Sequence, residues 1–580
     1  MSFFKQYKAY NLALNFKSIT MLTTFPTDIE IAQDANIQPI SAIANMLDIP
    51  YKYVEPYGHY KAKLSLDIIN SEVIGKNNLI LVTSINPTPA GEGKTTVSIG
   101  LADGLRQIGK ESIAVLREPS LGPVFGIKGG AAGGGFSQVI PMEDINLHFT
   151  GDFHAIEKAN NLLSAAIDNN IQNKKRSLNI DPRTIVWKRA MDMNDRALRN
   201  IIVGIGGKAN GLPREEGFNI TPASEIMAIL CLAENFNDLK QRLGAIYIGD
   251  TIQGEPIFAK DLKVVGAMAI LLKDAIKPNL VQTLEGTPVL LHGGPFASIA
   301  QGTNSVLATK MGLSLAEYVV TEAGFGADLG AEKFFQIKCA SSNLKPTTTV
   351  LVVTVRALRH HGGALKEEYN IADLDKVKKG FENVAKHIHN LKQFGMTPVV
   401  AINKFPNDSL EEIIFIEEAC RAMGVNAIES DGFANGGKGC KELAQAVIEE
   451  IQNHTSNFKL LYDKDLPIQG KILELATKIY GAKEVHYSAK ALNQIEELKK
   501  NGFDRFPICM VKTPNSLSDD PMAIGCPKDF DITVREFEVA AGAGFVLPIL
   551  GDTLRMPGLP SIPAAEHMDI DNNGTITGLS

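Results

Sequence analysis

The sequence contains few of the residues that build metal ribbons or disulfide frameworks. Among its 580 residues are six cysteines, none of which belongs to a C-x-x-C pair. Their wide spacing excludes a zinc ribbon and a disulfide-stapled scaffold, and it is typical of a reducing compartment. We therefore expect a cytoplasmic protein that depends on a hydrophobic core. The six are Cys231, Cys339, Cys420, Cys440, Cys509 and Cys526.

Long apolar runs and an excess of basic charge are also missing. No run approaches the ~20 apolar residues that a membrane-spanning helix needs, so no membrane partner is expected. The formal net charge of -7 gives no electrostatic reason to expect nucleic acid as a partner. The one local basic run, at 174–176, is interpreted as a solvated helix face.

The N-terminal stretch 1–27 contains lysine but neither acidic residues nor arginine. A basic, acid-free N-terminus can be an organellar transit segment, although such segments are usually rich in arginine. We favour the alternative that Met21 is the working start and that residues 1–20 are an upstream extension.

One stretch organises the rest of the chain. Residues 79–84 are apolar and predict a buried parallel strand, while residues 95–105 have helical spacing. In a glycine-rich loop between such elements, backbone N–H groups bind phosphate, a lysine reaches the outer phosphates and a threonine hydroxyl reaches Mg²⁺. We therefore predict a nucleotide site, with Thr95 as the Mg²⁺ ligand. Its residues are Thr88, Pro89, Ala90, Gly91, Glu92, Gly93, Lys94 and Thr95.

Thr88 departs from the general G-x-x-x-x-G-K-[ST] pattern, which has glycine at this position. A threonine with positive φ would be strained. Pro89 instead biases Thr88 towards extended backbone. The loop is therefore expected to begin with a different turn.

Further β-rich apolar runs alternate with helical patterns along the chain. This alternation predicts an α/β fold of the P-loop NTPase kind, with a mostly parallel sheet, helices on both faces and smaller α/β domains besides. Ligands of such sheets bind at the carboxyl ends of the strands. The predicted strands are 112–116, 201–204, 245–248, 289–291, 318–321, 350–354 and 398–403.

Arg117 and Glu118 directly follow the second predicted strand. A guanidinium group there can hold two oxygens of a phosphate or acyl phosphate, and a structural salt bridge is the alternative. The following stretch from Gly126 to Phe136 contains six glycines in eleven residues, which lets the backbone approach a ligand or another segment closely. A flexible linker is the alternative interpretation.

Three segments, at 88–95, 126–136 and 352–363, carry the most specific motifs of the chain. They closely resemble motifs of the formate–tetrahydrofolate ligase family, and the resemblance extends over 28–580, the length of the single-function form. The family usually has His, Cys and Trp at the positions of Gln301, Thr303 and Phe433. The three segments are Thr88 to Thr95, Gly126 to Phe136 and Val352 to Gly363.

The resemblance implies ATP-dependent ligation of formate to tetrahydrofolate, through bound formyl phosphate, giving 10-formyltetrahydrofolate, ADP and phosphate. It implies a homotetramer and activation by a monovalent cation, K⁺ or NH₄⁺. Lys94 and Arg117 would be catalytic, and Glu118 and Asp152 would bind the monovalent cation.

Phe405 and Phe433 match the family's ring-stacking positions for the pterin of folate, and a role in the hydrophobic core is the alternative for both. The nucleotide and folate sites are expected on opposite sides of a formate pocket around Arg117. The expected units are an extension at 1–27, a nucleotide-binding and catalytic domain at 28–380, a folate-site region at 381–470 and a C-terminal α/β domain at 471–580.

Two rival functions have weaker support. Asn403-Lys-Phe-Pro406 superficially resembles the guanine-reading Asn-Lys-x-Asp, but proline stands where aspartate is needed. A dinucleotide fold is suggested by the glycines at 204–211, where Ala209 replaces the last glycine and no acidic residue about twenty residues on lies in a clear second strand. Neither pattern favours a nucleotide switch or an oxidoreductase over a ligase.

Overall fold

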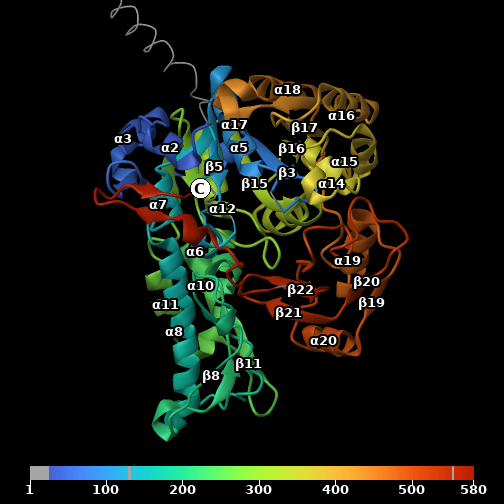
Figure 1. Ribbon diagram of the computed structural model, residues 1–580. Helices are drawn as coiled ribbons and strands as arrows, with labels where there is room; N and C mark the ends of the chain where they lie inside the picture. The colour runs from blue at the N-terminus through green and yellow to red at the C-terminus, as the bar shows by residue number, and fades with distance from the viewer. Residues whose placement is uncertain (1–24, 90, 128–131, 552–553, 580) are drawn as a thin grey trace, which may run out of the picture.

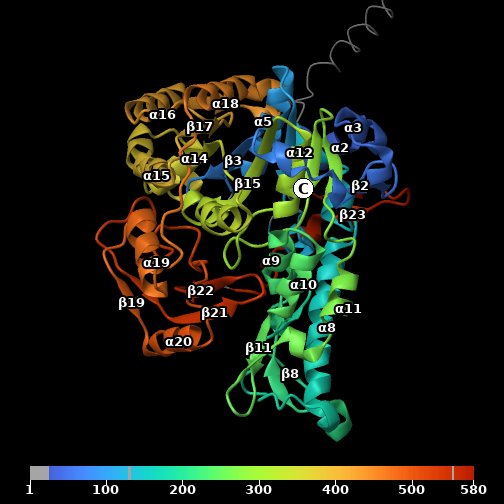
Figure 2. The same cartoon turned by 180° about the vertical axis from the view of Figure 1, so that it is seen from behind.

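The computed structural model describes residues 25–89, 91–127, 132–551 and 554–579. A large sheet with its helices forms the upper part of the molecule, and two smaller regions lie side by side below it (Figure 1, Figure 2). One is an arm around the long helix α8 (Asp152–Gln172), and the other is the C-terminal region. In the described part of the chain, no helix is long and apolar enough to cross a membrane.

The main sheet is mixed, with a parallel half and an antiparallel half. Its strand order is β1-β2-β13-β14-β4-β15-β3-β16-β17-β18, and the seven strands from β14 to β18 are parallel to their neighbours. The parallel strands are β14 (Pro288–Leu291), β4 (Ser112–Leu116), β15 (Tyr318–Gly326), β3 (Asn78–Ser84), β16 (Thr348–Val353), β17 (Pro398–Asn403) and β18 (Ala427–Ser430). The sequence prediction of a mostly parallel α/β sheet is confirmed for this half.

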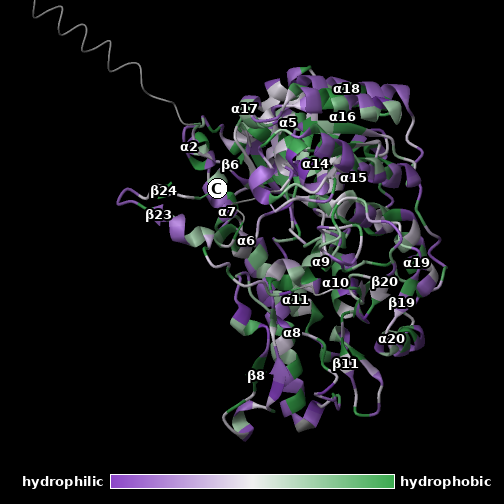
Figure 3. Cartoon of the chain, turned by 45° about the vertical axis from the view of Figure 1, so that its right-hand side comes forward, coloured by the Kyte–Doolittle hydropathy of each residue, from purple (hydrophilic) through white to green (hydrophobic). Residues whose placement is uncertain are grey.

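The strands of the parallel half are apolar throughout because helices cover both of their faces. In β3, Ile80 and Val82 pack with helices on one face, while Leu79 and Leu81 pack with helices on the other. Helices α5 (Lys94–Gln107) and α18 (Lys441–Asn453) cover the first face. The second face is covered by α14 (Val355–His361), α15 (Leu374–Gln393) and α16 (Leu410–Ala422). Outer helices such as α18 carry both hydrophobic and hydrophilic residues, as one-sided packing requires (Figure 3).

The antiparallel half was not expected from the sequence. It consists of short strands whose apolar residues do not alternate clearly with polar ones. Strand β13 pairs antiparallel with β14, β2 and β6 and so joins this half to the parallel half. Their lengths of three to five residues give too few positions for an alternation to be recognised. They are β1 (Val54–Pro56), β2 (Ala62–Leu64), β6 (Ser137–Ile140) and β13 (Asn279–Thr283), with β5 (Gly133–Gly134) pairing to β6.

Two predicted strands lie outside the main sheet. The run at 201–204 forms β8 (Ile201–Val203), which pairs only with β9 (Arg214–Glu216), and the run at 245–248 contributes to β11 (Tyr247–Asp250), which pairs with β12 (Pro256–Phe258). None of the β8 residues is fully buried, so this run cannot be a central strand. The expectation that both belong to the parallel sheet is therefore wrong.

The arm has an apolar cluster of its own, whereas most buried apolar residues of the C-terminal region share a cluster with the second face of the main sheet. Apolar residues of the arm helices pack together and also contact the hairpin of β21 (Glu536–Ala540) and β22 (Phe545–Ile549). The arm helices are α8, α9 (Glu225–Leu232), α10 (Phe236–Gly244) and α11 (Val265–Leu271). The C-terminal region adds α19 (Ile468–Glu474), β19 (Val485–Tyr487), α20 (Ala489–Lys500) and β20 (Ile532–Val534).

The two ends of the described chain meet in a small cluster at the edge of the molecule. Helix α2 (Asp28–Gln33) begins at the capping residue Thr27, with a complete capping box. Its Ile29 packs in one apolar cluster with Leu579, and the Gln33 amide donates to the Ile576 carbonyl at 2.9 Å. The remaining elements near this edge are α3 (Ile40–Met46), α4 (Ser71–Ile74), α6 (Leu121–Phe125), α7 (Met142–Asn146), β23 (Asp569–Ile570) and β24 (Ile576–Thr577).

Candidate active site

The glycine-rich loop joins the carboxyl end of β3 to helix α5. Gly93 caps α5 with φ of 72°, a left-handed conformation that favours glycine. It also has no room for a side chain, because a Cβ would lie 2.4 Å from Asn403 Nδ2. The first turn of the helix thus presents its N–H groups at the strand edge, where an anion can bind.

The loop is closed by a buried carboxylate. Both the backbone N–H and the hydroxyl of Thr88 donate to Glu92 Oε1, at 2.7 and 2.9 Å, and the Thr354 hydroxyl donates to Glu92 Oε2. Glu92 therefore shapes the loop from within, as a fixed part of the structure. Pro89 is exposed beside it, and Ala90 lies outside the described residues.

Lys94 and Thr95 open the helix and point to polar groups on neighbouring strands. The Lys94 ammonium donates to the hydroxyl of Ser84, the last residue of β3, at 3.1 Å. The Thr95 hydroxyl donates to Glu322 Oε2 at 2.7 Å. Glu322 is 3% exposed and belongs to β15, the strand next to β3. A hydroxyl and a carboxylate oxygen side by side are the ligand types that Mg²⁺ prefers.

Arg117 follows β4 and reaches the same glutamate. Its Nε and Nη2 atoms both lie 3.4 Å from Glu322 Oε1. The backbone of β15 makes room for the guanidinium, since a Cβ on Gly324 would lie 2.8 Å from Arg117 Nη1. Sequence reasoning missed Glu322, although its place just beyond a predicted strand at the ligand edge was a usable signal.

Two residues that depart from the family pattern are buried near β15, and one of them contacts this strand. Gln301 and Thr303 are both fully buried, and Thr303 forms a β-bridge with Ala323. The strand register shifts between Glu322 and Gly326. Both substituted positions therefore belong to the scaffold behind the site.

Glu118 and Asp152 lie together in a buried polar cluster, with a lysine beside them. The Lys63 ammonium is 2.7 Å from Asp152 Oδ1, and the Asn279 amide donates to Asp152 Oδ2 at 2.8 Å and to Glu118 Oε1 at 3.0 Å. Burial, followed by the charge of Asp152, raises the pKa of Glu118 well above its usual value. We see no signal in the sequence for Lys63, whose role becomes apparent only from its burial.

These donors bear on the predicted monovalent cation. A bound cation needs oxygen acceptors, whereas an ammonium and an amide N–H₂ already face the oxygens of Asp152 and Glu118. The pair as it stands does not fit K⁺ or NH₄⁺. A cation at these residues stays a prediction.

Phe405 and Phe433 follow the neighbouring strands β17 and β18. The Phe405 ring lies under the Arg356 guanidinium at 4.7 Å, and Arg356 Nη2 also donates to the Gly91 carbonyl at 3.0 Å. Arg356 thus links the ring to the nucleotide loop. Arg356 lies within the motif from Val352 to Gly363, and its position just after β16 was the signal that could have identified it.

Phe433 lies on a short helix that follows β18. The glycine-rich segment around it forms α17 (Gly432–Asn435), and the ring remains 37% exposed. From the sequence, we expected Arg117 between the nucleotide site and the folate site. In the observed strand order β4-β15-β3-β16-β17-β18, the nucleotide loop lies between the strand of Arg117 and the strands of the phenylalanines.

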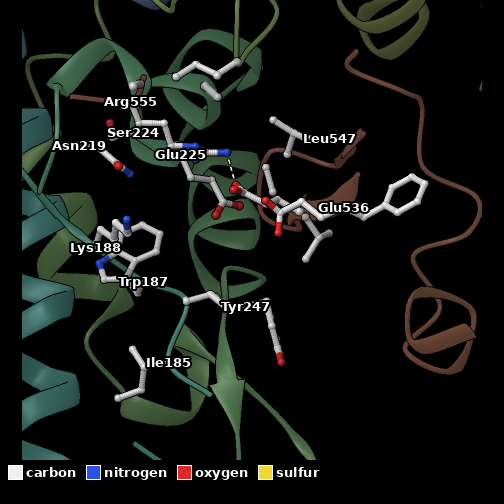
Figure 4. A pocket seen from close by; sticks show the side chains of 18 of the residues that line it. Ile185, Trp187, Lys188, Asn219, Ser224, Glu225, Tyr247, Glu536, Leu547 and Arg555 are labelled. Carbon is white, nitrogen blue, oxygen red and sulfur yellow. Dashed lines mark hydrogen bonds and ion pairs between the residues drawn. The ribbon is translucent and has the colours of Figure 1, made fainter. Parts of the chain in front are cut away.

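A second hollow of about 560 Å³ lies apart from the loop, between the arm and the C-terminal region (Figure 4). Trp187 and Tyr247 form part of its wall, and the Glu225 carboxylate accepts from the N–H groups of Gly542 and Ala543 at 2.7 and 3.3 Å. Several charged groups of its lining form ion pairs within one region. These pairs are Arg214–Glu216 in the arm, and Lys490–Glu536 and Arg555–Glu538 in the C-terminal region. The hydrogen bonds of Glu225 join the two regions here.

The sheet and its polar carboxyl edge define an enzyme of the α/β class, with its candidate site where parallel strands end. A family model for formate–tetrahydrofolate ligase matches residues 26–580, and the chain belongs to this family. It is therefore a ligase of one-carbon metabolism that acts on formate and tetrahydrofolate.

Proposed function

We propose that the chain drives this ligation with ATP and passes through formyl phosphate, using the edge formed by β4, β15 and β3. The observation that carries the proposal is Glu322, which accepts from Thr95 of the loop helix and from Arg117 of the next strand. One carboxylate thereby fixes the distance between the phosphate-binding loop and the group best suited to hold formate.

The first step is the phosphorylation of formate. A formate oxygen forms a bond to the γ-phosphorus of ATP while the bond from that phosphorus to the β-γ bridging oxygen breaks, leaving ADP and formyl phosphate. Lys94 and the loop N–H groups stabilise the charge on the transferred group, and the guanidinium of Arg117 orients formate. Thr95 and Glu322 would hold Mg²⁺, which supplies neutralising charge at the phosphates.

The second step is acyl transfer. The N10 amine of tetrahydrofolate attacks the formyl carbon, phosphate leaves with the oxygen that formate contributed, and N10 loses its proton. Phe405 and Phe433 follow β17 and β18, which lie on the other side of β3 and its loop from β4, and they would stack the pterin. We propose no role for Glu118 and Asp152 in either step, because Lys63 and Asn279 satisfy them.

An isotope experiment tests the two-step route. Purified protein supplied with ATP, tetrahydrofolate and ¹⁸O-labelled formate should transfer one labelled oxygen to phosphate and give 10-formyltetrahydrofolate. Release of unlabelled phosphate would contradict an acyl phosphate intermediate. Formation of product without ATP would contradict the nucleotide role of the loop.

A variant of the loop lysine tests the site itself. Lys94→Ala should lower the ligase rate by ~10²–10³, because it removes a charge that stabilises the transferred phosphoryl group. Lys76→Ala, an exposed lysine that precedes β3, is the matched control and should keep the wild-type rate. Circular dichroism of both variants checks that the fold is intact. A Lys94→Ala rate within about threefold of wild type would remove this residue from the site.

A further inference from the structure

Phe433 lies beside a turn that contains Gly134 and Gly135, which have no side chains to pack against its ring. A Cβ built on Gly135 would be 2.1 Å from the Phe433 carbonyl oxygen, and one built on Gly134 would be 3.3 Å from ring atom Cε2. The N–H of Phe136 donates to the Phe433 carbonyl at 2.8 Å. The glycines allow this close backbone approach, and they leave the ring without packing partners on that side.

Phe25 supplies a partner for the ring. The rings of Phe25 and Phe433 are stacked, with centroids 5.3 Å apart and planes 22° from parallel. Among aromatic rings of the described residues, Phe25 is the one in contact with Phe433, and its edge also meets Phe136 at 6.0 Å. Phe433 therefore has one supported face and remains partly open.

The position of Phe25 is fixed by the residues that follow it. Pro26 restricts the backbone on both sides of their shared peptide bond. Thr27 caps α2, and the next residue, Asp28, accepts from the Gly135 N–H at 2.7 Å. Both stacked rings are thus attached to one glycine turn, and Phe25 is held there as part of the folded structure.

We propose that Phe25 is a positioning residue for the folate site, which rests on the proposed role of Phe433 in stacking the pterin. A phenyl ring presents less area than the indole that the family usually has at this position. The ring of Phe25 backs Phe433 and holds its plane, so that the open face meets the pterin.

The test uses the full chain and compares Phe25→Ala with Phe25→Tyr, which keeps the ring. Phe25→Ala should raise the KM for tetrahydrofolate about two- to tenfold, the range expected for one aromatic pair. Its kcat and its KM for ATP should not change, and Phe25→Tyr should restore the wild-type KM. Phe236→Ala, which removes another exposed ring at 41% exposure, is the control and should leave all three constants unchanged.

A second comparison tests whether the ring of Phe25 supports the ring of Phe433 or only touches it. Phe433→Trp should tighten tetrahydrofolate binding more in the Phe25→Ala background than in wild type, because the indole supplies its own area. A lowered KM in Phe25→Ala would mean that the ring covers the site, and an unchanged KM that it plays no part; either overturns the proposal. Isothermal titration of wild type with tetrahydrofolate tests the proposed function separately, since absence of binding there would overturn both.

Discussion

Glu322 fixes the positions of a hydroxyl and a guanidinium group at the edge of the sheet. One of its oxygens accepts from Thr95 of helix α5 at 2.7 Å, and the other accepts from Arg117, which follows β4, at 3.4 Å. A neutral amide in its place keeps the size but loses the negative charge and one acceptor. We therefore expect Glu322→Gln to lower the ligase rate by ~10²–10³ and to raise the Mg²⁺ concentration needed for half-maximal rate.

Rates measured over a series of Mg²⁺ concentrations check this expectation. Glu317→Gln is the matched control, because Glu317 is exposed and immediately precedes the start of the same strand. It should behave as wild type. A Glu322→Gln variant with a normal rate and normal Mg²⁺ dependence would show that this carboxylate is structural only.

Helix α5 carries the loop, and its packing depends on glycine. A Cβ on Gly104 would lie 2.7 Å from the Cys440 carbonyl oxygen, so backbone would have to move. Gly104→Ala should lower the free energy of unfolding by about 1–3 kcal/mol, because overpacking outweighs the better helix propensity of alanine.

Chemical denaturation of Gly104→Ala and Gly266→Ala measures the difference. Gly266 lies in α11 and has open space around its Cβ position, so Gly266→Ala should stabilise the protein by about 0.5–1 kcal/mol. Equal effects of the two substitutions would argue against the close contact at Gly104.

How far the sequence predicts these elements depends on burial and length. The run 398–403 is apolar on both faces and was predicted with its observed bounds. The β2 strand was not predicted, because three residues that include a buried lysine, Lys63, show no apolar pattern. The loop could be predicted because phosphate binding requires its residue types in one local order. The contacts of Glu322 with Thr95 and Arg117 could not be predicted, since these partners lie far away in sequence.

At the scale of the whole molecule, the arm and the C-terminal region meet at Glu225. Burial raises the pKa of this carboxyl from 4.5 to about 7, although hydrogen bonds from Gly542 and Ala543 act to lower it. The folded state therefore holds the proton more tightly than the unfolded chain. This contribution to stability is complete below pH ~4.5 and is lost as the pH rises through about 7.

Glu225→Gln isolates the effect, because it keeps an oxygen acceptor for Gly542 and Ala543 but cannot ionise. Thermal midpoints measured from pH 4.5 to 8.5 should show wild type losing stability relative to the variant up to about pH 7, with a constant difference above it. Glu538→Gln is the control at the neighbouring Arg555. A Glu225→Gln difference that does not change with pH would contradict the assignment.

The homotetramer, the cytoplasmic location and the unit boundaries stay predictions.

The cluster that joins α2 to the last strands has a consequence for the order in which the chain folds. The hydrogen bond from Gln33 to Ile576 spans 543 residues, and Leu579 completes the apolar contacts of Ile29. A chain emerging from the ribosome makes its N-terminal elements first, and contacts of such high sequence separation form late. The packing of helix α2 is therefore completed only after residues 576–579 have been synthesised and have folded against it. Phe25, attached to that helix, reaches its place against Phe433 among the last steps of folding.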